Sequence, residues 1–205
     1  FDGWSEATFA AAIADSGQDA GLARALFPRA GLDLAAAYHR AGDAAMTAAL
    51  ATRDLTTLRF RDRVALAIRL RLDGADKELV RRGSSLFALP NHAVEGAGLI
   101  WGTADAVWNA LGDTSRDLNW YSKRASLSAV YASTVLFWLG DTSEGSADTW
   151  AFLDRRIENV MQFEGLKATA QKNPLVQALM SGPLKVLERI SAPQGAMDLP
   201  GKMKG

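Results

Sequence analysis

The chain has 205 residues with 23 basic and 23 acidic side chains, so no net charge draws it to nucleic acid or an anionic membrane. It has no cysteine, which excludes disulfides, thiolate metal sites and cysteine nucleophiles. No apolar run reaches the roughly 18 residues of a membrane span, and no signal-peptide pattern opens the sequence. A cytoplasmic protein is therefore expected.

Residues 1–54 contain the signals of three helices. Ser5 can cap a first helix that runs to about Asp15 and is ended by Gly17, because glycine accepts a left-handed backbone. Asp19 can cap a short second helix that ends near residues 27–28. A third, longer helix is predicted over residues 30–51.

The middle of the chain continues with helical spacing. A helix is predicted over residues 55–72, with apolar residues on one stripe and four arginines largely off it: Arg59, Arg63, Arg69 and Arg71. Further helices are predicted over residues 77–89 and 91–111, the second beginning after Pro90, because proline suits a first helical turn.

A five-residue sequence then occurs twice. Leu-Gly-Asp-Thr-Ser stands at residues 111–115 and again at 139–143. In both copies the glycine is expected to close one helix in a left-handed conformation, and a polar residue to cap the next. The flanking helices are predicted over residues 120–139 and 148–170.

About nine helices and no convincing strand pattern predict an all-α bundle. Residues 55–172 are expected to form the main helical domain, with residues 1–54 as a smaller appendage. A last helix is predicted after the Asn173-Pro174 break, within the segment 173–191, and residues 192–205 are expected to be a disordered tail.

Catalytic and metal-binding motifs are scarce. The two histidines, His39 and His92, have no second histidine at helical spacing, and we interpret both as structural. The glycines at positions 96, 98 and 102 do not follow a strand, so they indicate close helix packing and not a dinucleotide site. We therefore expect no catalytic residue, no metal and no cofactor.

Aromatic residues cluster between positions 101 and 152. Trp120 and Tyr121 are adjacent, so both cannot face the same interior, and they precede Lys123 and Arg124. This pair is either an interaction surface or part of the core. The helix over residues 120–139 is apolar nearly all round, so it is either fully surrounded or lines an apolar cavity.

The last predicted helix, Pro174–Ile190, is amphipathic. It either docks on the bundle or lies on a membrane surface. Its apolar residues follow helical spacing: Val176, Leu179, Met180, Leu184, Leu187 and Ile190.

The front helices resemble the helix-turn-helix of TetR-type regulators. The resemblance covers Thr8–Gly21 and continues to Phe27-Pro28 without a gap, and those proteins have one further helix in front, which would be missing here. DNA reading needs polar or basic side chains on the recognition helix. Residues 19–26 offer only Arg24, and Asp19 is negative. The fold is therefore expected without the DNA binding.

Motifs across nearly the whole chain resemble the ubiquinone (coenzyme Q) biosynthesis accessory family often called COQ-nine. The most specific is Asp117-Leu118-Asn119-Trp120-Tyr121-Ser122-Lys123-Arg124. The others are Leu89-Pro90-Asn91, Asp105-Ala106-Val107-Trp108, Gly112-Asp113-Thr114-Ser115 and Asp148-Thr149-Trp150-Ala151-Phe152-Leu153. The resemblance implies a TetR-like helical fold, an apolar pocket for isoprenoid lipids, membrane contact through the last helix, and support of demethoxyubiquinone hydroxylase.

The resemblance also implies roles for particular residues. The surface that meets the hydroxylase would comprise Asp117, Asn119, Trp120, Tyr121 and Arg124. Pocket residues cannot be matched one by one, and the apolar pattern alone suggests Leu99, Trp108, Leu127, Tyr131, Leu136 and Trp138. The protein would be a non-catalytic accessory protein, peripheral on the inner membrane of a bacterium or on the matrix side in a mitochondrion, and possibly a homodimer. The alternative is a TetR-type transcriptional regulator with an apolar ligand pocket.

Overall fold

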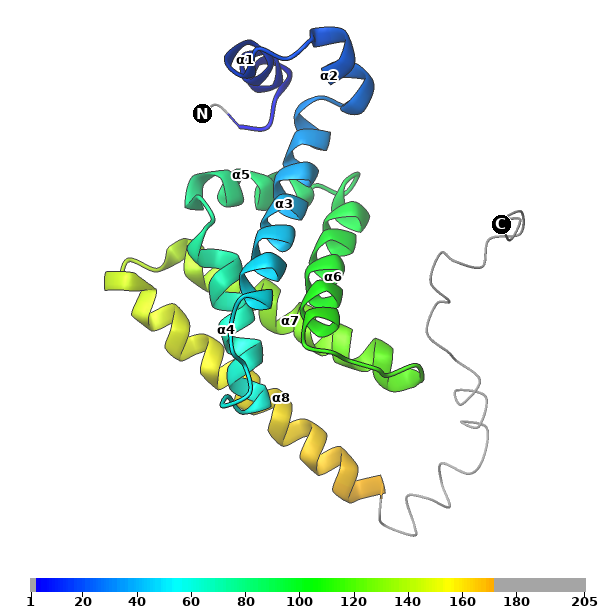
Figure 1. Cartoon of the computed structure of the whole chain (residues 1–205), viewed down its shortest axis with the longest axis vertical. Helices are drawn as coiled ribbons and strands as arrows, with labels where there is room; N and C mark the ends of the chain where they lie inside the picture. Colours follow the sequence, from blue (N-terminus) through cyan, green and yellow to red (C-terminus); the bar gives the residue numbers. More distant parts are fainter. Residues whose placement is uncertain (1–2, 172–205) are drawn as a thin grey trace, which may run out of the picture.

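The computed structural model describes residues 3–171, with side chains as far as Gln162. Within this range the chain forms eight α-helices and one short 3₁₀ helix, with no strand, which confirms the predicted all-α fold (Figure 1). In chain order the elements are α1 (Glu6–Ser16), α2 (Ala20–Leu26), α3 (Gly31–Ala51), α4 (Phe60–Asp73), α5 (Lys77–Phe87), α6 (Ala93–Ala110), α7 (Leu118–Gly140), η1 (Glu144–Ser146) and α8 (Ala147–Gln171).

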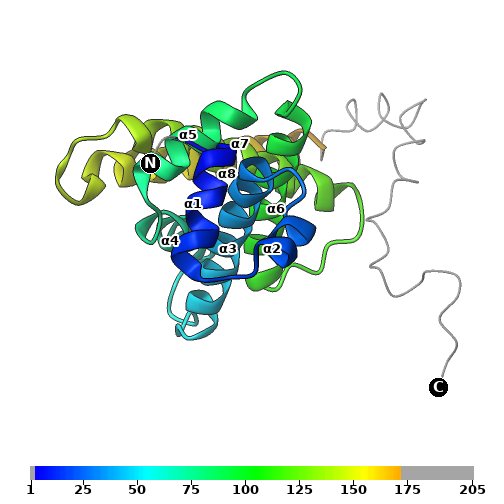
Figure 2. The same cartoon turned by 90° about the horizontal axis from the view of Figure 1, so that it is seen from above.

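The first two helices begin and end where the sequence predicted. The hydroxyl of Ser5 accepts a hydrogen bond from the backbone N–H of Thr8, and Gly17 ends α1 with φ at 64°. The carboxylate of Asp19 accepts from the N–H of Leu22 and caps α2. Figures 1 and 2 show both helices at one end of the molecule, over the start of α3.

Helix α3 is the long element that joins this end to the rest of the bundle. It packs against both α4 and α6. Its residues Met46 and Leu50 are almost fully buried and belong to the same hydrophobic core as α4, α6 and α7. The proposed boundary at residue 54 stays a prediction, but the first three helices are not packed as a separate unit.

Helix α4 differs from its prediction in two ways. It begins at Phe60 and not near residue 55, because the carboxylate of Asp54 accepts hydrogen bonds from the N–H and hydroxyl of Thr56 and holds a turn there. Arg71, expected off the apolar stripe, is buried, since it forms an ion pair with Asp43 of α3 at 2.7 Å. The burial of this charge depends on a partner that periodicity within one helix cannot reveal.

Helix α6 packs on both α3 and α7, and α7 packs in turn on α8. The core lies among α3, α4, α6, α7 and α8. Its fully or almost fully buried members include Ile68, Leu72, Val107, Leu127, Tyr131, Trp138, Leu153 and Ile157. Helix α5 crosses one end of this group and leaves a hollow beneath it.

The two copies of Leu-Gly-Asp-Thr-Ser adopt different structures. Gly112 has φ at 78°, as predicted, but Gly140 is the last residue of α7 and has no positive φ. The prediction for the second copy was therefore wrong. There Asp141 ends α7, and its carboxylate accepts hydrogen bonds from the N–H groups of Ser143 and Thr149, which fixes the start of α8.

The predicted helix over residues 148–170 corresponds to α8 (Ala147–Gln171). The predicted last helix Pro174–Ile190 and the predicted tail 192–205 lie outside the described residues.

Candidate functional site

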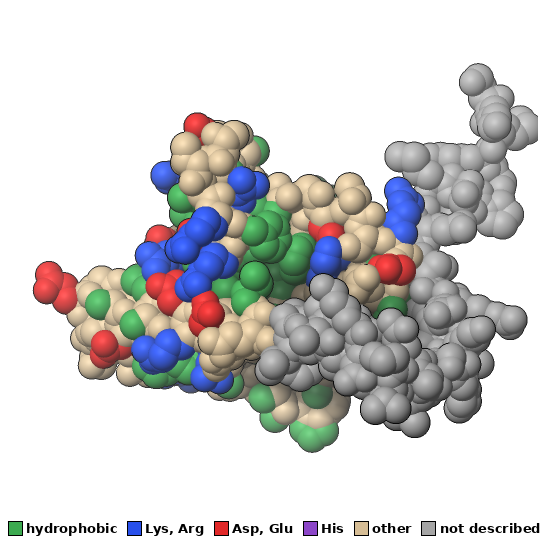
Figure 3. Space-filling view, turned by 90° about the horizontal axis from the view of Figure 1, so that it is seen from below, with side chains coloured by type: hydrophobic (Ala, Val, Ile, Leu, Met, Phe, Trp, Pro, Cys, Tyr) green, Lys and Arg blue, Asp and Glu red, His purple; other side chains and the backbone are tan. Residues whose placement is uncertain are grey.

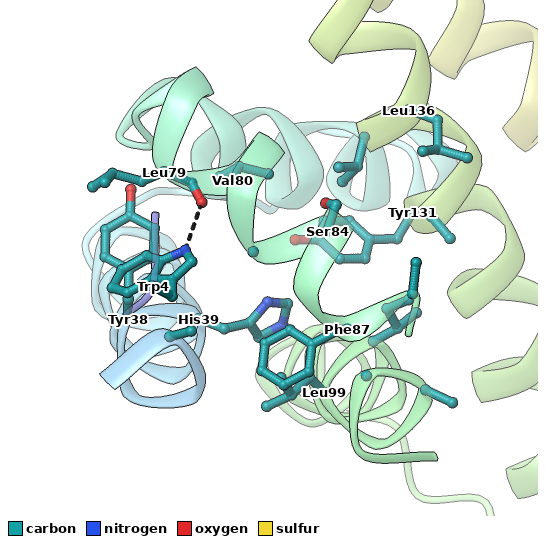
Figure 4. Close-up of a pocket in the computed structure, with 18 of the residues that line it drawn as sticks. Trp4, Tyr38, His39, Leu79, Val80, Ser84, Phe87, Leu99, Tyr131 and Leu136 are labelled. Carbon is teal, nitrogen blue, oxygen red and sulfur yellow. Dashed lines mark hydrogen bonds between the residues drawn. The ribbon is translucent and has the colours of Figure 1, made fainter. Parts of the chain in front are cut away.

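A cavity of about 350 Å³ lies between α3, α5, α6 and α7, and we call it the central cavity. Figure 4 shows the side chains that surround it. Most of them are apolar. Three helices provide most of the apolar wall: Leu79, Val80 and Phe87 from α5, Leu99 and Ile100 from α6, and Val135 and Leu136 from α7. A concave apolar space of this size is typical of small-molecule pockets.

Trp4 closes one side of the central cavity. Its indole N–H donates to the backbone carbonyl of Leu79 at 3.1 Å, and its ring lies 5.5 Å from that of Tyr38 (Figure 4). The hydroxyl of Tyr38 in turn accepts from the N–H of Asp76, the cap of α5. The segment before α1 is thus fastened to α5 across the cavity.

Polar side chains meet at one wall of the central cavity. Arg71 pairs with Asp43 at 2.7 Å and donates to the backbone carbonyl of His39 at 2.9 Å. Thr103 lies 2.9 Å from both the carboxylate of Asp43 and Nε2 of His39. The edge of the His39 ring faces Tyr131, with the ring centroids 6.4 Å apart. We call these five residues the buried polar cluster.

Burial fixes the protonation of two members of this cluster. It lowers the pKa of His39, and the nearby carboxylate of Asp43 does not offset this effect, so the imidazole is neutral at neutral pH. Burial also raises the pKa of Tyr131 to about 12, so its phenol keeps its proton. The only full charges in the cluster are therefore those of the Arg71–Asp43 pair.

A second cavity of about 270 Å³ lies at the end of the molecule where α4 begins and α6 ends. Figure 3 shows hydrophobic side chains exposed on this end, flanked by lysines or arginines. Phe60 stacks on Trp108 at 5.3 Å, and the ammonium of Lys123 stands over the Trp108 ring at 5.1 Å. Val64, Leu127, Val130, Ile157 and Met161 also line this cavity.

Three aromatic side chains gather where α6 meets the start of α7. Trp120 and Tyr121 lie edge to face at 4.8 Å, and Trp101 of α6 lies 5.9 Å and 6.5 Å from them. All three are half-buried. We call them the corner cluster. The sequence singled out two of them, and missed Trp101 because it precedes Trp120 by nineteen residues and belongs to another helix.

Arg124 supports the corner cluster from within. It is buried and stacks under Trp120, with Cζ 4.1 Å from the ring centroid. It donates to Asp105 at 2.5 Å and to Asp113 at 3.1 Å. Lys123 also donates to Asp113, at 2.7 Å. Burial opposes the ionisation of Asp113, but the hydrogen bonds from Lys123, Ser115 and Arg124 outweigh it and lower its pKa to about 2.

Comparison with known proteins identifies relatives of the region that contains the corner cluster. The COQ9 family model matches residues 93–164, the region of α6, α7 and most of α8. This region of the chain is therefore similar to the COQ9 family. The match confirms the predicted resemblance over these residues and includes every quoted motif except Leu89-Pro90-Asn91.

Curated proteins agree with this match. The human protein named "Ubiquinone biosynthesis protein COQ9, mitochondrial" is 36% identical over 103 residues, 48% of this chain and 32% of that protein. A probable ubiquinone biosynthesis protein of Dictyostelium discoideum is 36% identical over 111 residues, 53% of this chain and 36% of that protein. Protein COQ9-A of Xenopus laevis is 32% identical over 120 residues, 58% and 38%. The chain thus spans about a third of the length of these relatives.

The pocket residues suggested by the apolar pattern fall in three places. Leu99, Tyr131 and Leu136 line the central cavity. Trp108 and Leu127 line the second cavity. Trp138 is buried in the core below the ammonium of Lys77, which stands 5.2 Å from its ring centroid, and it is not among the residues lining either cavity.

Most of the central cavity was not predicted. His39 was interpreted as a structural residue. It does belong to the buried polar cluster, but it also lines the cavity. The α5 residues Ser84 and Phe87 also line it. In sequence α5 is an ordinary amphipathic helix, so no local signal distinguishes a helix that covers a cavity from one that covers a filled core.

The predicted partner surface, which lies in the region that matches the COQ9 family model, is partly exposed. Asp117 and Asn119 are exposed, with the carboxylate of Asp117 capping α7 and accepting from the amide of Asn119 at 2.9 Å. Trp120 and Tyr121 lie beside them in the corner cluster. Arg124 departs from the expectation, since burial and its hydrogen bonds leave it a positioning role beneath Trp120.

Other features of the described residues bear on function. The one basic side chain of α2, Arg24, forms an ion pair with Glu6 and stands over the Phe9 ring at 4.9 Å. Within the described part of the chain, no group of three or more acidic or histidine side chains is placed to hold a metal ion. None of the described helices is both long enough and apolar enough to cross a membrane.

Proposed function

We propose that this protein is a non-catalytic, lipid-binding accessory protein of ubiquinone biosynthesis. It binds isoprenoid quinone precursors in the central cavity and presents them to demethoxyubiquinone hydroxylase through the corner cluster. The observation that carries the proposal is the apolar cavity bordered by the region that matches the COQ9 family model. The names of the relatives, which are ubiquinone biosynthesis proteins, supply the pathway.

The energetics favour a hydrocarbon ligand in this cavity. Each CH₂ group that moves from water into an apolar environment gains about 0.8 kcal/mol. The walls that Leu79, Val80, Phe87 and Ile100 provide offer such an environment. A polyprenyl chain therefore gains free energy on entering it from water.

Organic extraction of the protein purified from cells, followed by mass spectrometry, tests lipid binding. We expect an isoprenoid quinone or quinone precursor at near-stoichiometric yield. Ala132→Phe, which adds a ring from α7 into the cavity, should remove it, whereas Ala129→Phe at an exposed position of the same helix should not. An empty extract from the unmodified protein would contradict the proposal.

The corner cluster has the composition of a protein interface. Tryptophan, tyrosine and arginine are enriched among the residues that contribute most to binding. Here two tryptophans and a tyrosine form one half-buried group, and Arg124 holds Trp120 in place from below. The exposed Asp117 and Asn119 provide polar groups at its edge.

Trp120→Ala tests this surface in a pull-down with purified hydroxylase. We expect the complex to be lost while the helical circular dichroism is unchanged, since α7 begins at the Asp117 cap and does not depend on this ring. The matched control is Trp150→Ala, which removes a half-buried tryptophan from α8, far along the chain. A complex that survives Trp120→Ala would remove the corner cluster from the proposal.

Membrane contact through residues 174–190 is part of the same proposal. The segment lies outside the described residues, and its amphipathic spacing supports the role. Replacing Leu184 and Leu187 with Asp should reduce co-sedimentation with liposomes. Unchanged co-sedimentation would mean that this segment does not hold the protein at the membrane.

A homodimer would fit the exposed apolar side chains of α7. Leu136 is 68% exposed and Phe137 38% exposed, and Phe137 stacks on Phe152 of α8 at 4.6 Å. Light scattering of the purified protein distinguishes a monomer from a dimer. We expect Phe137→Ser to favour the monomer.

The side chains of α2 give little support to the alternative function, a transcriptional regulator that binds DNA. A recognition helix needs basic or polar side chains free for phosphates and base edges, and the only basic side chain of α2 is paired with Glu6. Leu22 and Leu26 are the exposed large residues of this helix. No salt-dependent binding to promoter DNA is expected, and its detection would favour the regulator.

A further inference from the structure

The central cavity is mostly apolar, and three uncharged polar side chains line it beside the Arg71–Asp43 pair. They are His39 of α3, Ser84 of α5 and Tyr131 of α7. Figure 4 labels all three of these side chains among the residues that surround the cavity. We call these three residues the polar spot. A few convergent polar groups in an apolar pocket are what fixes the orientation of a bound ligand.

The hydrogen bonds around Thr103 determine the tautomer of His39. The hydroxyl of Thr103 has one proton and lies 2.9 Å from the carboxylate of Asp43, the strongest acceptor near it. It then accepts from His39, whose Nε2 lies 2.9 Å away, so Nε2 carries the proton. In a neutral imidazole the other nitrogen, Nδ1, is then an unprotonated acceptor.

The two hydroxyl groups of the polar spot differ in their partners. Tyr131 keeps its phenolic proton because burial raises its pKa to about 12, and its hydroxyl also contacts Thr103. Ser84 is half-buried on α5, and its hydroxyl forms no hydrogen bond with any described residue. The polar spot therefore offers the O–H group of Ser84, the phenol oxygen of Tyr131 and one imidazole nitrogen to whatever fills the cavity.

The charge of the neighbouring groups excludes an anion. Among the described residues that line the cavity, Arg71 is the only cation, and Asp43 already neutralises it at 2.7 Å. A carboxylate or phosphate in the cavity would lose its hydration without gaining an unpaired positive charge, which is strongly unfavourable. A neutral oxygen loses less hydration and finds both donors and an acceptor.

We propose that the polar spot binds a neutral oxygen of the ligand, a hydroxyl or carbonyl group, while the walls from α5, α6 and α7 hold its hydrocarbon part. Ser84, Tyr131 and His39 are thus specificity-determining residues for an apolar molecule with one oxygenated, uncharged end. This inference rests on the proposed function, since it concerns the same cavity. In this arrangement the oxygenated end of the ligand lies inside the protein, so the ligand must leave the cavity to reach the hydroxylase.

Three probes of equal chain length separate these contributions: decane, 1-decanol and decanoate. Each competes with the neutral fluorophore N-phenyl-1-naphthylamine for the full chain. The quantity measured is the preference for decanol, the dissociation constant of decane divided by that of decanol. A neutral hydrogen bond corresponds to a change of about fivefold. We expect Ser84→Ala and Tyr131→Phe each to lower the preference by about fivefold and to leave decane binding unchanged.

Ser85→Ala is the matched control, because Ser85 is the exposed neighbour of Ser84 on α5 and donates only to the carbonyl of Arg81. It should leave the preference for decanol unchanged. Decanoate should bind at least tenfold more weakly than decanol, as the absence of an unpaired cation requires. Tighter binding of decanoate would overturn the charge argument and with it the choice of a neutral oxygen.

The outcomes also separate this inference from the proposed function. If none of the probes displaces the fluorophore from the unmodified protein, the cavity is not a ligand site and the proposed function fails. If decane and decanol both bind but Ser84→Ala and Tyr131→Phe keep the same preference, the cavity remains a lipid site and the polar spot is overturned.

Discussion

Two buried arginines support the two candidate sites, and they are neutralised differently. Arg71, at the wall of the central cavity, has one carboxylate partner, Asp43. Arg124, beneath the corner cluster, has two, Asp105 and Asp113. The side chains of Arg71 and Arg124 are only 3% and 1% exposed, so each needs its carboxylate partners to offset the cost of burying a charge.

The difference affects how each site tolerates change. The cluster around Arg71 has no spare carboxylate, and its other hydrogen bonds are to Thr103 and His39. The cluster around Arg124 also includes Lys123, which is 36% exposed and can be hydrated. The cavity wall is therefore expected to be more sensitive to a single substitution than the corner is.

Asp43→Asn should have the largest effect. It leaves the guanidinium of Arg71 buried with no carboxylate, and breaking a buried pair in this way costs about 3–5 kcal/mol. The free energy of unfolding in urea measures the loss. The control is Glu158→Gln, which removes the partner of Arg61 from a pair that is partly hydrated and worth about 1 kcal/mol. Equal losses of unfolding free energy in Asp43→Asn and Glu158→Gln would contradict the importance of Asp43 for the buried Arg71.

Asp113→Asn should have a smaller effect, because Arg124 keeps its bond to Asp105. We expect a loss of about 2 kcal/mol in the same measurement, from the weakened bonds to Arg124 and Lys123. If Asp113→Asn destabilised the protein more than Asp43→Asn, the remaining carboxylate of Asp105 would not be enough to offset the buried charge of Arg124.

The lowered pKa of Asp113 predicts that the free energy of unfolding depends on pH. Its pKa is lowered from 3.8 to about 2 in the folded protein, so the unfolded chain binds the proton more readily. The stabilisation is fully present above about pH 5 and is lost as the pH falls through 2, an amount of about 2 kcal/mol. The difference in unfolding free energy between the unmodified protein and Asp113→Asn should be constant from pH 5 to 7 and should shrink toward pH 2. A difference independent of pH would contradict the lowered pKa.

The sequence predicted most of the fold because helix ends have local causes. Ser5, Gly17 and Asp19 bound the first two helices as predicted, since capping acts within four residues. The same reasoning was wrong at Gly140, where α7 continues to the glycine and Asp141 takes over. Identical residues behave differently in the two copies, because Asp113 meets Lys123 and Arg124 whereas Asp141 meets the start of α8.

The candidate site was predicted less well, because it depends on contacts between distant residues. Adjacent aromatic residues cannot share one interior, and this rule identified Trp120 and Tyr121 from the sequence alone. Nothing local could identify Trp101, which joins them from α6. The burial of Arg71 is equally invisible, since its partner Asp43 stands 28 residues earlier in another helix.

Gly42 offers a way to disturb the Arg71 pair without removing a charge. A Cβ atom at this position would lie 2.5 Å from Nη1 and 2.6 Å from Cζ of Arg71, so the guanidinium would have to move away from Asp43. We expect Gly42→Ala to cost about 1–2 kcal/mol, since overpacking in a well-packed site outweighs the higher helix propensity of alanine. Urea unfolding measures this, and a gain in stability would show that Arg71 is free to shift.

Gly102 provides the opposite case and the smallest effect. It lies in α6 directly before Thr103, and nothing is within 4 Å of the place where its Cβ would stand. Alanine there should stabilise the protein by about 0.5–1 kcal/mol, the usual difference in helix propensity. Because the substitution is the same as at Gly42, the sign of the effect depends only on whether a buried arginine occupies the space. A loss of stability at both positions would mean that backbone freedom, and not the position of Arg71, explains why these helices contain glycine.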